Sequence, residues 1–266
     1  MQNQMKRTVS GVMILHGFTA NLDSVRELFP PLRAMGLRLN APLLKGHGSS
    51  SPDELRGVVW QDWLSDAERA LKTFAGADGC VVIIGHSMGA LLALHLAARY
   101  PEMVDSLVLV TPAIRLVSLL APGRPLHFLA PLISRFLDRW GLQTTMADPG
   151  KAIMPNQYGW APTRTILSFF DLVANSESVL GKVRAPVLIL HNRKESIVLP
   201  ESADIVYRRI ATPAAQKRIV WLERSDHQVF CDCERAVAVG AAVDFIAERF
   251  GGCRAHPETG TRSVAS

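Results

Sequence analysis

The chain has 266 residues, of which 48% are hydrophobic and 20% charged, and this composition excludes a mainly disordered protein. Its net charge of +5 comes from scattered basic residues, a pattern that disfavours nucleic-acid binding. The most apolar stretch, residues 81–98, is better explained as a strand plus a helix than as a stable membrane insertion. Residues 1–7 and the short apolar segment after them lack the pattern of a signal peptide, so we expect a cytoplasmic protein.

Short apolar runs bounded by turn residues alternate with amphipathic segments along the chain. The runs predict buried strands at 11–15, 37–40, 80–84, 106–110, 186–190 and 217–222. The amphipathic segments predict helices at 22–34, 60–74, 88–99, 200–210 and 232–249. This alternation is typical of an α/β fold, with a mostly parallel sheet of about six strands covered by helices on both faces. Active sites of such sheets lie at the carboxyl ends of the strands.

Residues 113–183 interrupt the alternation. The segment is rich in Leu, Phe, Trp and Pro and shows no convincing strand. About seventy residues are too many for a simple crossover, so we expect a helical cap over a core made of 1–112 and 184–250. The alternative is a long amphipathic crossover with no role in substrate binding. The polar tail, 251–266, lacks periodicity and is expected to be mobile.

A Gly-x-Ser-x-Gly motif, Gly85–Gly89, stands between the predicted strand 80–84 and the predicted helix 88–99. A serine on such a sharp strand-to-helix turn projects its hydroxyl from the edge of the sheet, and small flanking residues allow the crowded backbone. The motif in this context predicts that Ser87 is a catalytic nucleophile. The alternative is a tight glycine-rich turn in which Ser87 only caps a helix.

A serine nucleophile needs a neighbouring base, which this order of elements places after the last strand. His227 follows strand 217–222 and is therefore the candidate general base. The other histidines weighed for this role lie inside the motif, within a helix, in the cap, at a strand end and in the tail: His86, His95, His127, His191 and His256.

The acid that orients the base is expected after the preceding strand, 186–190, where Glu195 lies. Two other carboxylates are poorer candidates. Asp226 is adjacent to His227 and is badly placed to reach its ring, and Asp171 lies in the cap. Glu195 could also be an ordinary surface carboxylate on a loop.

An ester hydrolysis intermediate needs two hydrogen-bond donors for its oxyanion. The backbone N–H of Met88, which follows the nucleophile, is one candidate, and that of Phe18, after the first strand, is the other. We expect the side chains of both residues to line the acyl site, together with cap residues that the sequence does not identify individually. Alternatively, His16–Gly17 is a simple turn that ends a strand.

Five motifs together resemble the α/β-hydrolase superfamily, and small bacterial carboxylesterases and monoacylglycerol lipases in particular: His16–Thr19, Lys45–Gly48, Gly85–Gly89, Pro200–Ala203 and Ser225–His227. The resemblance covers about 10–112 and 184–249. It implies cofactor-free hydrolysis of carboxylic esters with short-to-medium acyl chains through an acyl-enzyme. It also implies Ser87 as nucleophile, His227 as base, residue 195 as acid, and Phe18 and Met88 as oxyanion donors.

The chain departs from these relatives at two positions. They usually carry Asp where this chain has Glu195, and Ser-Gly-His where this chain has Asp226 before the histidine. Glutamate is one methylene longer than aspartate, so the loop that carries it must retreat to keep the carboxylate at the base. The effect of Asp226 on His227 does not follow from the sequence.

We therefore expect a serine hydrolase that cleaves carboxylic esters, with monoacylglycerols among its candidate small-molecule substrates. An acyltransferase, thioesterase, amidase or carbon–carbon bond hydrolase would use the same triad, and a catalytically weak ligand-binding module is the alternative of another class. The resemblance implies that no cofactor is needed. No metal is expected, because Cys231 and Cys233 have the wrong spacing from His227 for zinc. The oligomeric state does not follow from the sequence.

Overall fold

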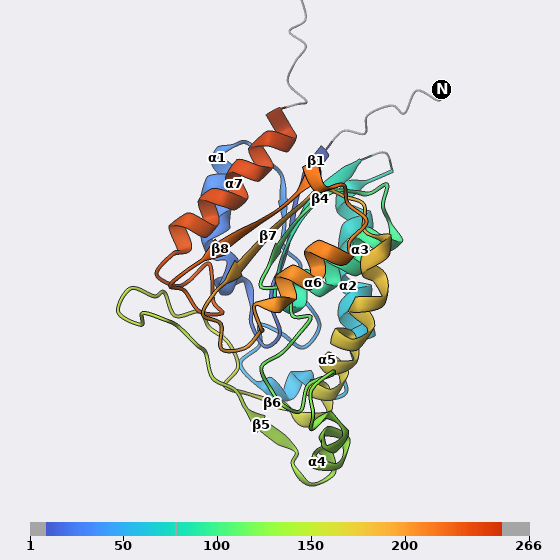
Figure 1. Ribbon diagram of the computed structural model, residues 1–266, viewed down its shortest axis with the longest axis vertical. Helices are drawn as coiled ribbons and strands as arrows, with labels where there is room; N and C mark the ends of the chain where they lie inside the picture. The colour runs from blue at the N-terminus through green and yellow to red at the C-terminus, as the bar shows by residue number, and fades with distance from the viewer. Residues whose placement is uncertain (1–8, 78, 252–266) are drawn as a thin grey trace, which may run out of the picture.

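The computed structural model describes residues 9–77 and 79–251 and has a six-stranded, wholly parallel sheet at its centre (Figure 1). In sheet order its strands are β2 (Leu39–Asn40), β1 (Val9–Leu15), β3 (Cys80–His86), β4 (Val104–Val110), β7 (Val187–Asn192) and β8 (Lys217–Leu222). The structure confirms the predicted parallel sheet and its six strands. All six end at the same edge, as parallel strands must.

Alternate residues of each central strand face opposite sides of the sheet. In β1, Val12 and Ile14 face one core cluster and Met13 and Leu15 the other. Helices α1 (Phe29–Ala34) and α7 (Arg235–Gly251) cover the first side, and the other side is covered by α2 (Trp60–Ala75), α3 (Met88–Arg99), α5 (Thr163–Ser176) and α6 (Glu201–Arg209). Burial on both faces explains why these strands are apolar throughout.

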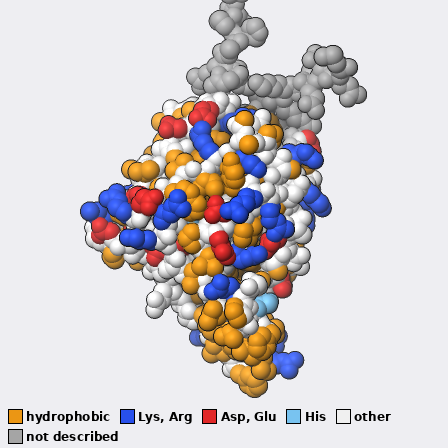
Figure 2. All heavy atoms as spheres, in the orientation of Figure 1, with side chains coloured by type: hydrophobic (Ala, Val, Ile, Leu, Met, Phe, Trp, Pro, Cys, Tyr) orange, Lys and Arg blue, Asp and Glu red, His pale blue; other side chains and the backbone are white. Residues whose placement is uncertain are grey.

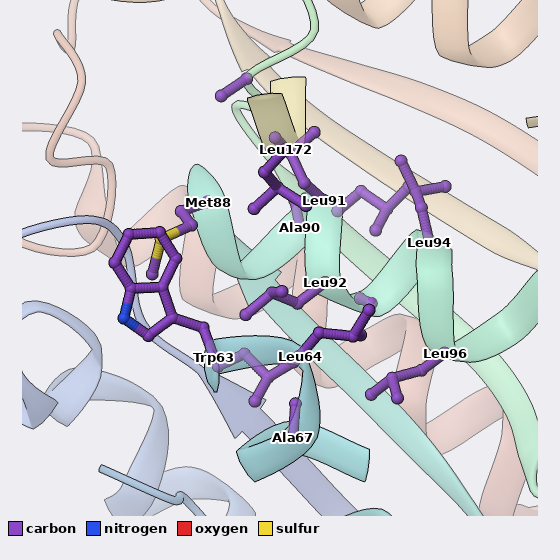
Figure 3. Close-up of a cluster of buried hydrophobic side chains, with 14 of the residues drawn as sticks. Trp63, Leu64, Ala67, Met88, Ala90, Leu91, Leu92, Leu94, Leu96 and Leu172 are labelled. Atoms are coloured by element: carbon purple, nitrogen blue, oxygen red, sulfur yellow. The ribbon is translucent and has the colours of Figure 1, made fainter. Parts of the chain in front are cut away.

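Helix α3 is apolar around its whole circumference, with all residues from Met88 to Ala97 buried. It lies between the sheet and helices α2 and α5, so none of its faces meets solvent. Figure 3 shows its leucines packed with Trp63 and Leu64 of α2 and Leu172 of α5. The Gly85–Gly89 motif is therefore attached to a helix that is buried on all sides.

Two predicted elements differ from the structure. The helix expected at 22–34 is a 3₁₀ segment, Leu22–Leu28, followed by the short α1, because Pro30 and Pro31 lack the N–H groups that a continuous helix would use. The other difference concerns 113–183, where no strand was expected. Strands β5 (Arg139–Gly141) and β6 (Trp160–Pro162) form an antiparallel pair there. Three-residue strands are too short to give a recognisable hydrophobic period.

The segment 113–183 also contains the 3₁₀ turns His127–Leu129 and Glu177–Lys182, helix α4 (Ala130–Phe136) and helix α5. Helix α4 and the β5–β6 pair project beyond the sheet at one end of the molecule (Figure 1). Two further 3₁₀ turns, Pro52–Leu55 and Ala214–Gln216, belong to connections in the core. Of the tail expected at 251–266, residues 252–266 lie outside the described residues.

Candidate active site

Ser87 occupies a strained turn between β3 and α3. Its backbone has φ 55° and ψ −111°, a combination that non-glycine residues rarely adopt. The flanking glycines make this turn possible. A Cβ atom on Gly85 would lie 2.4 Å from the carbonyl oxygen of Gly89, and one on Gly89 would lie 2.3 Å from that of Leu15. Both contacts are with backbone, which cannot move aside, so only glycine fits at either position.

Three polar side chains from separate loops meet at the carboxyl edge of the sheet. The Oγ of Ser87 lies 3.1 Å from Nε2 of His227, on the loop after β8. The Nδ1 of the same ring lies 3.1 Å from Oε1 of Glu195, on the loop after β7. That oxygen also accepts hydrogen bonds from the backbone N–H groups of Ile197 and Val198, at 3.0 and 3.3 Å. The longer glutamate therefore reaches the imidazole without leaving its own loop.

Glu195 and His227 interact strongly, because the Glu195 side chain is fully buried and solvent does not screen its charge. Burial by itself would raise the pKa of Glu195, but the charge and hydrogen bond of His227 and the Ile197 N–H outweigh it and lower that pKa to about 2. Burial would lower the pKa of His227, whereas the Glu195 charge and hydrogen bond raise it above its usual 6.5. Glu195 is thus ionised at neutral pH and stabilises a protonated imidazole.

The loop after β1 is held against the serine by two buried histidines. A Cβ on Gly17 would lie 3.4 Å from that of Ser87. The ring of His16 accepts a hydrogen bond from the backbone N–H of Leu44, and that of His47 accepts one from Thr19, which has φ 60°. Burial lowers the pKa of His16 to about 4 and that of His47 to about 3, so both rings are neutral and can accept. Sequence analysis missed the role of His47.

Phe18 lies between these histidines and the cavity described below. Its ring stacks on Phe169 of α5 with centroids 5.0 Å apart, and it lines the cavity beside Ser87. The expectation for the side chain of Met88 is wrong. Met88 is fully buried, packs in the core cluster with Trp63, and is absent from the cavity lining (Figure 3). Met88 is the first residue of α3, and its side chain is directed into the helix layer. Of the two roles expected for Met88, only that of its backbone N–H as a donor to the oxyanion remains a candidate.

The other histidines weighed as a base serve structural contacts. His86 lies 2.9 Å, through Nε2, from the backbone carbonyl of His227 and is kept neutral because burial lowers its pKa to about 3. His95 lies 3.2 Å from the hydroxyl of Ser176. The rings of His127 and His191 contact backbone carbonyls, while His256 lies outside the described residues.

Sequence analysis also missed two carboxylates that shape the loop of His227. Asp232 accepts hydrogen bonds from the backbone N–H groups of Asp226, Cys233, Ala147 and Asp148, which joins this loop to the segment 113–183. Glu234 accepts from Arg224 and Ser225 N–H. These two roles could not be predicted from the sequence, because only the tertiary fold brings the backbone N–H groups to the two carboxylates.

A cavity of about 410 Å³ opens beside Ser87 and His227. Residues of 113–183 form much of its wall, together with Phe18 and Ile197. Its apolar lining from that segment consists of Leu116, Val117, Leu120, Ala130, Ile133, Trp140, Leu142, Ile166, Leu167, Phe169 and Phe170. Its polar lining includes Gln143, Thr145, Gln157 and Gln228, and no Asp, Glu, Lys or Arg among the described residues contributes to the wall.

Cys231 and Cys233 lie in the turn before α7. Burial raises the pKa of the Cys231 thiol to about 11, which disfavours the thiolate. Within 9–77 and 79–251, no three His, Cys, Asp or Glu side chains are grouped so that they could hold a metal ion. In the same ranges, no helix combines the length and apolarity needed to cross a bilayer.

Comparison with known proteins identifies the family. The Hydrolase_4 model, described as serine aminopeptidase, S33, matches residues 6–234, and the chain belongs to this family. It is 27% identical over 241 residues to the thermostable monoacylglycerol lipase of Bacillus sp. (strain H-257), covering 91% of this chain and 92% of that protein. Its identity to the carboxylesterase of Bacillus subtilis (strain 168) is 25% over 238 residues, covering 88% and 91%.

A solved structure shares the fold of this chain. A solved structure of the metagenome-derived lipolytic enzymes LipS and LipT superposes with a TM-score of 0.80 at 24% identity, covering 91% of this chain and 96% of that one. This likeness and the parallel sheet confirm the predicted α/β-hydrolase fold. The resemblance to carboxylesterases and monoacylglycerol lipases is likewise confirmed.

Proposed function

We propose that this chain, a carboxylic ester hydrolase, acts through Ser87 as nucleophile, His227 as general base and Glu195 as the acid that orients it. One observation carries the proposal. The hydroxyl, the imidazole and the carboxylate are joined by two contacts of 3.1 Å, and the hydroxyl faces an apolar cavity. A carboxylate only accepts hydrogen bonds, so Nδ1 carries the proton of the neutral ring and Nε2 is free to accept the proton of Ser87.

The geometry supports a two-step reaction. Ser87 Oγ attacks the ester carbonyl while its proton passes to Nε2 of His227, and Glu195 stabilises the imidazolium that forms. The backbone N–H groups of Met88 and Phe18 are proposed to hold the oxyanion. The imidazolium then protonates the leaving alcohol, which departs and leaves the acyl-enzyme. Water, deprotonated by His227, hydrolyses this ester by the same route.

The cavity favours an uncharged, apolar acyl group. The described residues of its wall include no carboxylate to bind the α-ammonium group that an aminopeptidase substrate would carry, even though the family description names that activity. Its volume, about 410 Å³, suits a short-to-medium acyl chain. The names of the bacterial relatives, a monoacylglycerol lipase and a carboxylesterase, agree with this assignment and make monoacylglycerols the first natural substrates to test.

We assign 113–183 the role of a cap that selects substrates over a core of 1–112 and 184–250. The wall formed by residues from Leu116 to Phe170 supports this role and argues against a crossover with no part in binding. The cytoplasmic location and the lack of a nucleic-acid partner stay predictions of the sequence.

The test is hydrolysis of p-nitrophenyl esters from acetate to palmitate, beside a monoacylglycerol, by the wild type and Ser87→Ala. We expect turnover that has a chain-length optimum and falls about 10⁶-fold in the variant, as for loss of a serine nucleophile elsewhere. Turnover that survives the substitution would refute the assignment. Faster transfer to an added alcohol than to water would indicate an acyltransferase, and tight binding without turnover a binding module.

A further inference from the structure

Among residues 9–77 and 79–251, the most exposed apolar surface lies in the first part of the segment 113–183, on residues 117–137, which we call the cap tip. Phe136 is 85% exposed and Phe128 72% exposed, and four leucines of the cap tip are exposed beside them: Leu119, Leu126, Leu132 and Leu137. Figure 2 shows hydrophobic side chains gathered at the end of the molecule where Figure 1 places α4. A patch of this kind marks an interaction surface.

The charge of the cap tip indicates the kind of partner. Its 21 residues include no Asp or Glu and two arginines, Arg124 and Arg135. Neither arginine forms an ion pair with a carboxylate among residues 9–77 and 79–251, whereas most surface arginines of the core do. An apolar surface with unpaired cations and no anions matches an anionic lipid–water interface, which offers both acyl chains and phosphates.

The opposite side of the same segment faces the cavity. Leu120, Ala130 and Ile133 line the cavity wall, while Phe128, Leu132 and Phe136 point to solvent and do not. One short stretch of chain thus separates the proposed acyl site from the exposed patch. We propose that the cap tip docks reversibly onto anionic lipid surfaces and so places the cavity where apolar esters partition. The proposal rests on the proposed function only in taking the cavity as an acyl site.

The test measures flotation with vesicles of phosphatidylglycerol or of phosphatidylcholine, using Ser87→Ala protein so that no lipid is consumed. We expect binding to the anionic vesicles that is weakened by salt. Adding Phe128→Ser and Phe136→Ser should lower the bound-to-free ratio at least tenfold. Each of Arg124→Gln and Arg135→Gln should lower it about fivefold. The matched control is Leu43→Ser with Val237→Ser, two exposed apolar residues outside the cap tip, which should change nothing.

Hydrolysis of soluble p-nitrophenyl butyrate by the same variants with Ser87 intact separates the two proposals. Serine-dependent hydrolysis without vesicle binding would overturn docking and leave the proposed function standing. Vesicle binding without serine-dependent hydrolysis would overturn the proposed function and leave the docking proposal standing. If light scattering shows a dimer that the Phe128→Ser, Phe136→Ser protein loses while vesicle binding is unchanged, the cap tip is a contact between copies and the docking proposal is wrong.

Asp226 lies on the loop after β8, directly before the proposed base His227. Its carboxylate accepts hydrogen bonds from the backbone N–H of Ser196 at 2.9 Å, from the Ser196 hydroxyl at 2.8 and 2.9 Å, and from the backbone N–H of His227 at 2.8 Å. Ser196 is the residue directly after Glu195. Asp226 therefore links the neighbour of the acid to the base itself, without touching the imidazole ring.

We infer that Asp226 is a positioning residue whose carboxylate fixes the loop of Glu195 relative to His227. A glutamate carboxylate has one more rotatable bond than an aspartate, so its contact with Nδ1 depends more strongly on where its backbone is held. The side chain of Asn192 contributes to the same link, since it donates to the Asp226 carbonyl at 2.6 Å and to Glu195 Oε2 at 3.3 Å. The two departures from the family pattern, Glu195 and Asp226, thus form one structural unit.

A double-mutant cycle on p-nitrophenyl butyrate tests this inference. We expect Asp226→Ala to lower kcat 10- to 100-fold with KM changed less than threefold, and Asp226→Asn, which keeps one acceptor oxygen, to have a smaller effect. In the Glu195→Gln background the same Asp226→Ala change should have little further effect, because Asp226 acts through the carboxylate of residue 195. An equal loss in both backgrounds, or an unchanged kcat in Asp226→Ala, would overturn the inference.

Discussion

The carboxyl edge of the sheet and the cap tip are built on opposite physical principles. At the edge, the Glu195 carboxylate, the His227 imidazole and the Ser87 hydroxyl are almost fully buried, and each has a hydrogen-bond partner at a fixed distance. At the cap tip, large apolar side chains such as Phe136 face solvent and the two arginines have no ion-pair partner among the described residues. Under the two proposals above, the buried edge carries out the reaction, which needs rigid geometry, and the cap tip docks onto lipid, which needs accessible surface.

After the loss of the Ser87 nucleophile, the largest expected effect comes from the acid. Glu195→Gln should lower kcat about 10⁴-fold, because a neutral amide neither holds the Nδ1–H tautomer nor stabilises the imidazolium. The raised pKa of His227 places the rise of wild-type kcat/KM with pH above pH 6.5, since only the neutral ring is a base. Removing the Glu195 carboxylate removes the largest cause of that increase, so the rise of the residual activity with pH should begin at a lower pH than in the wild type.

Rate–pH profiles of the wild type, Glu195→Gln and the charge-conserving Glu195→Asp check this prediction. Glu195→Asp should retain far more activity than the amide. Glu195→Gln activity within tenfold of the wild type would show that residue 195 is not the acid.

The strained turn at Ser87 offers a comparison in stability. Gly89→Ala would place Cβ 2.3 Å from one backbone oxygen and 2.7 Å from another, so we expect a loss of at least about 3 kcal/mol in the free energy of unfolding. Gly159→Ala in the segment 113–183 meets nothing within 4 Å and should change it by less than about 0.5 kcal/mol. Urea denaturation measures the free energy of unfolding of both variants. Similar losses in Gly89→Ala and Gly159→Ala would show that the turn at Ser87 is not more tightly packed than the segment 113–183.

A substitution in the cap wall should change selectivity and leave the chemistry intact. Leu167 of α5 lines the cavity, and Leu167→Trp would fill part of it. We expect kcat/KM for p-nitrophenyl laurate to fall about tenfold while that for the acetate changes less than threefold. A parallel fall for both esters would mean that the cavity does not hold the acyl chain.

The smallest expected effect concerns the neutral histidines of the edge. The pKa of His47 is lowered from 6.5 to about 3, so below pH 6.5 the unfolded chain takes up a proton that the folded chain cannot, and stability falls as pH falls. His47→Gln should remove roughly 1 kcal/mol of the stability lost between pH 6 and pH 5. Urea denaturation at the two pH values tests this, and an identical loss in variant and wild type would refute it.

The parts of this molecule that follow from its sequence are those fixed by local hydrophobic runs. Strands such as β3 are apolar on both faces, and the parallel order then places Ser87, Glu195 and His227 at one edge. The rest depends on long-range packing. Met88 faces the core because of how α3 lies on α2, and Asp226 matters because a distant loop presents Ser196 to it. The β5–β6 pair is too short to leave a pattern.

The most direct test of the triad is to trap its covalent intermediate. Protein mixed with a slowly hydrolysed p-nitrophenyl ester is quenched in acid within the burst phase, digested and analysed by peptide mass spectrometry. The proposed mechanism predicts one equivalent of acyl group on the peptide that contains Ser87, formed far more slowly in His227→Ala and absent in Ser87→Ala. Continued turnover with the acyl group on another residue, or with none bound, would contradict it.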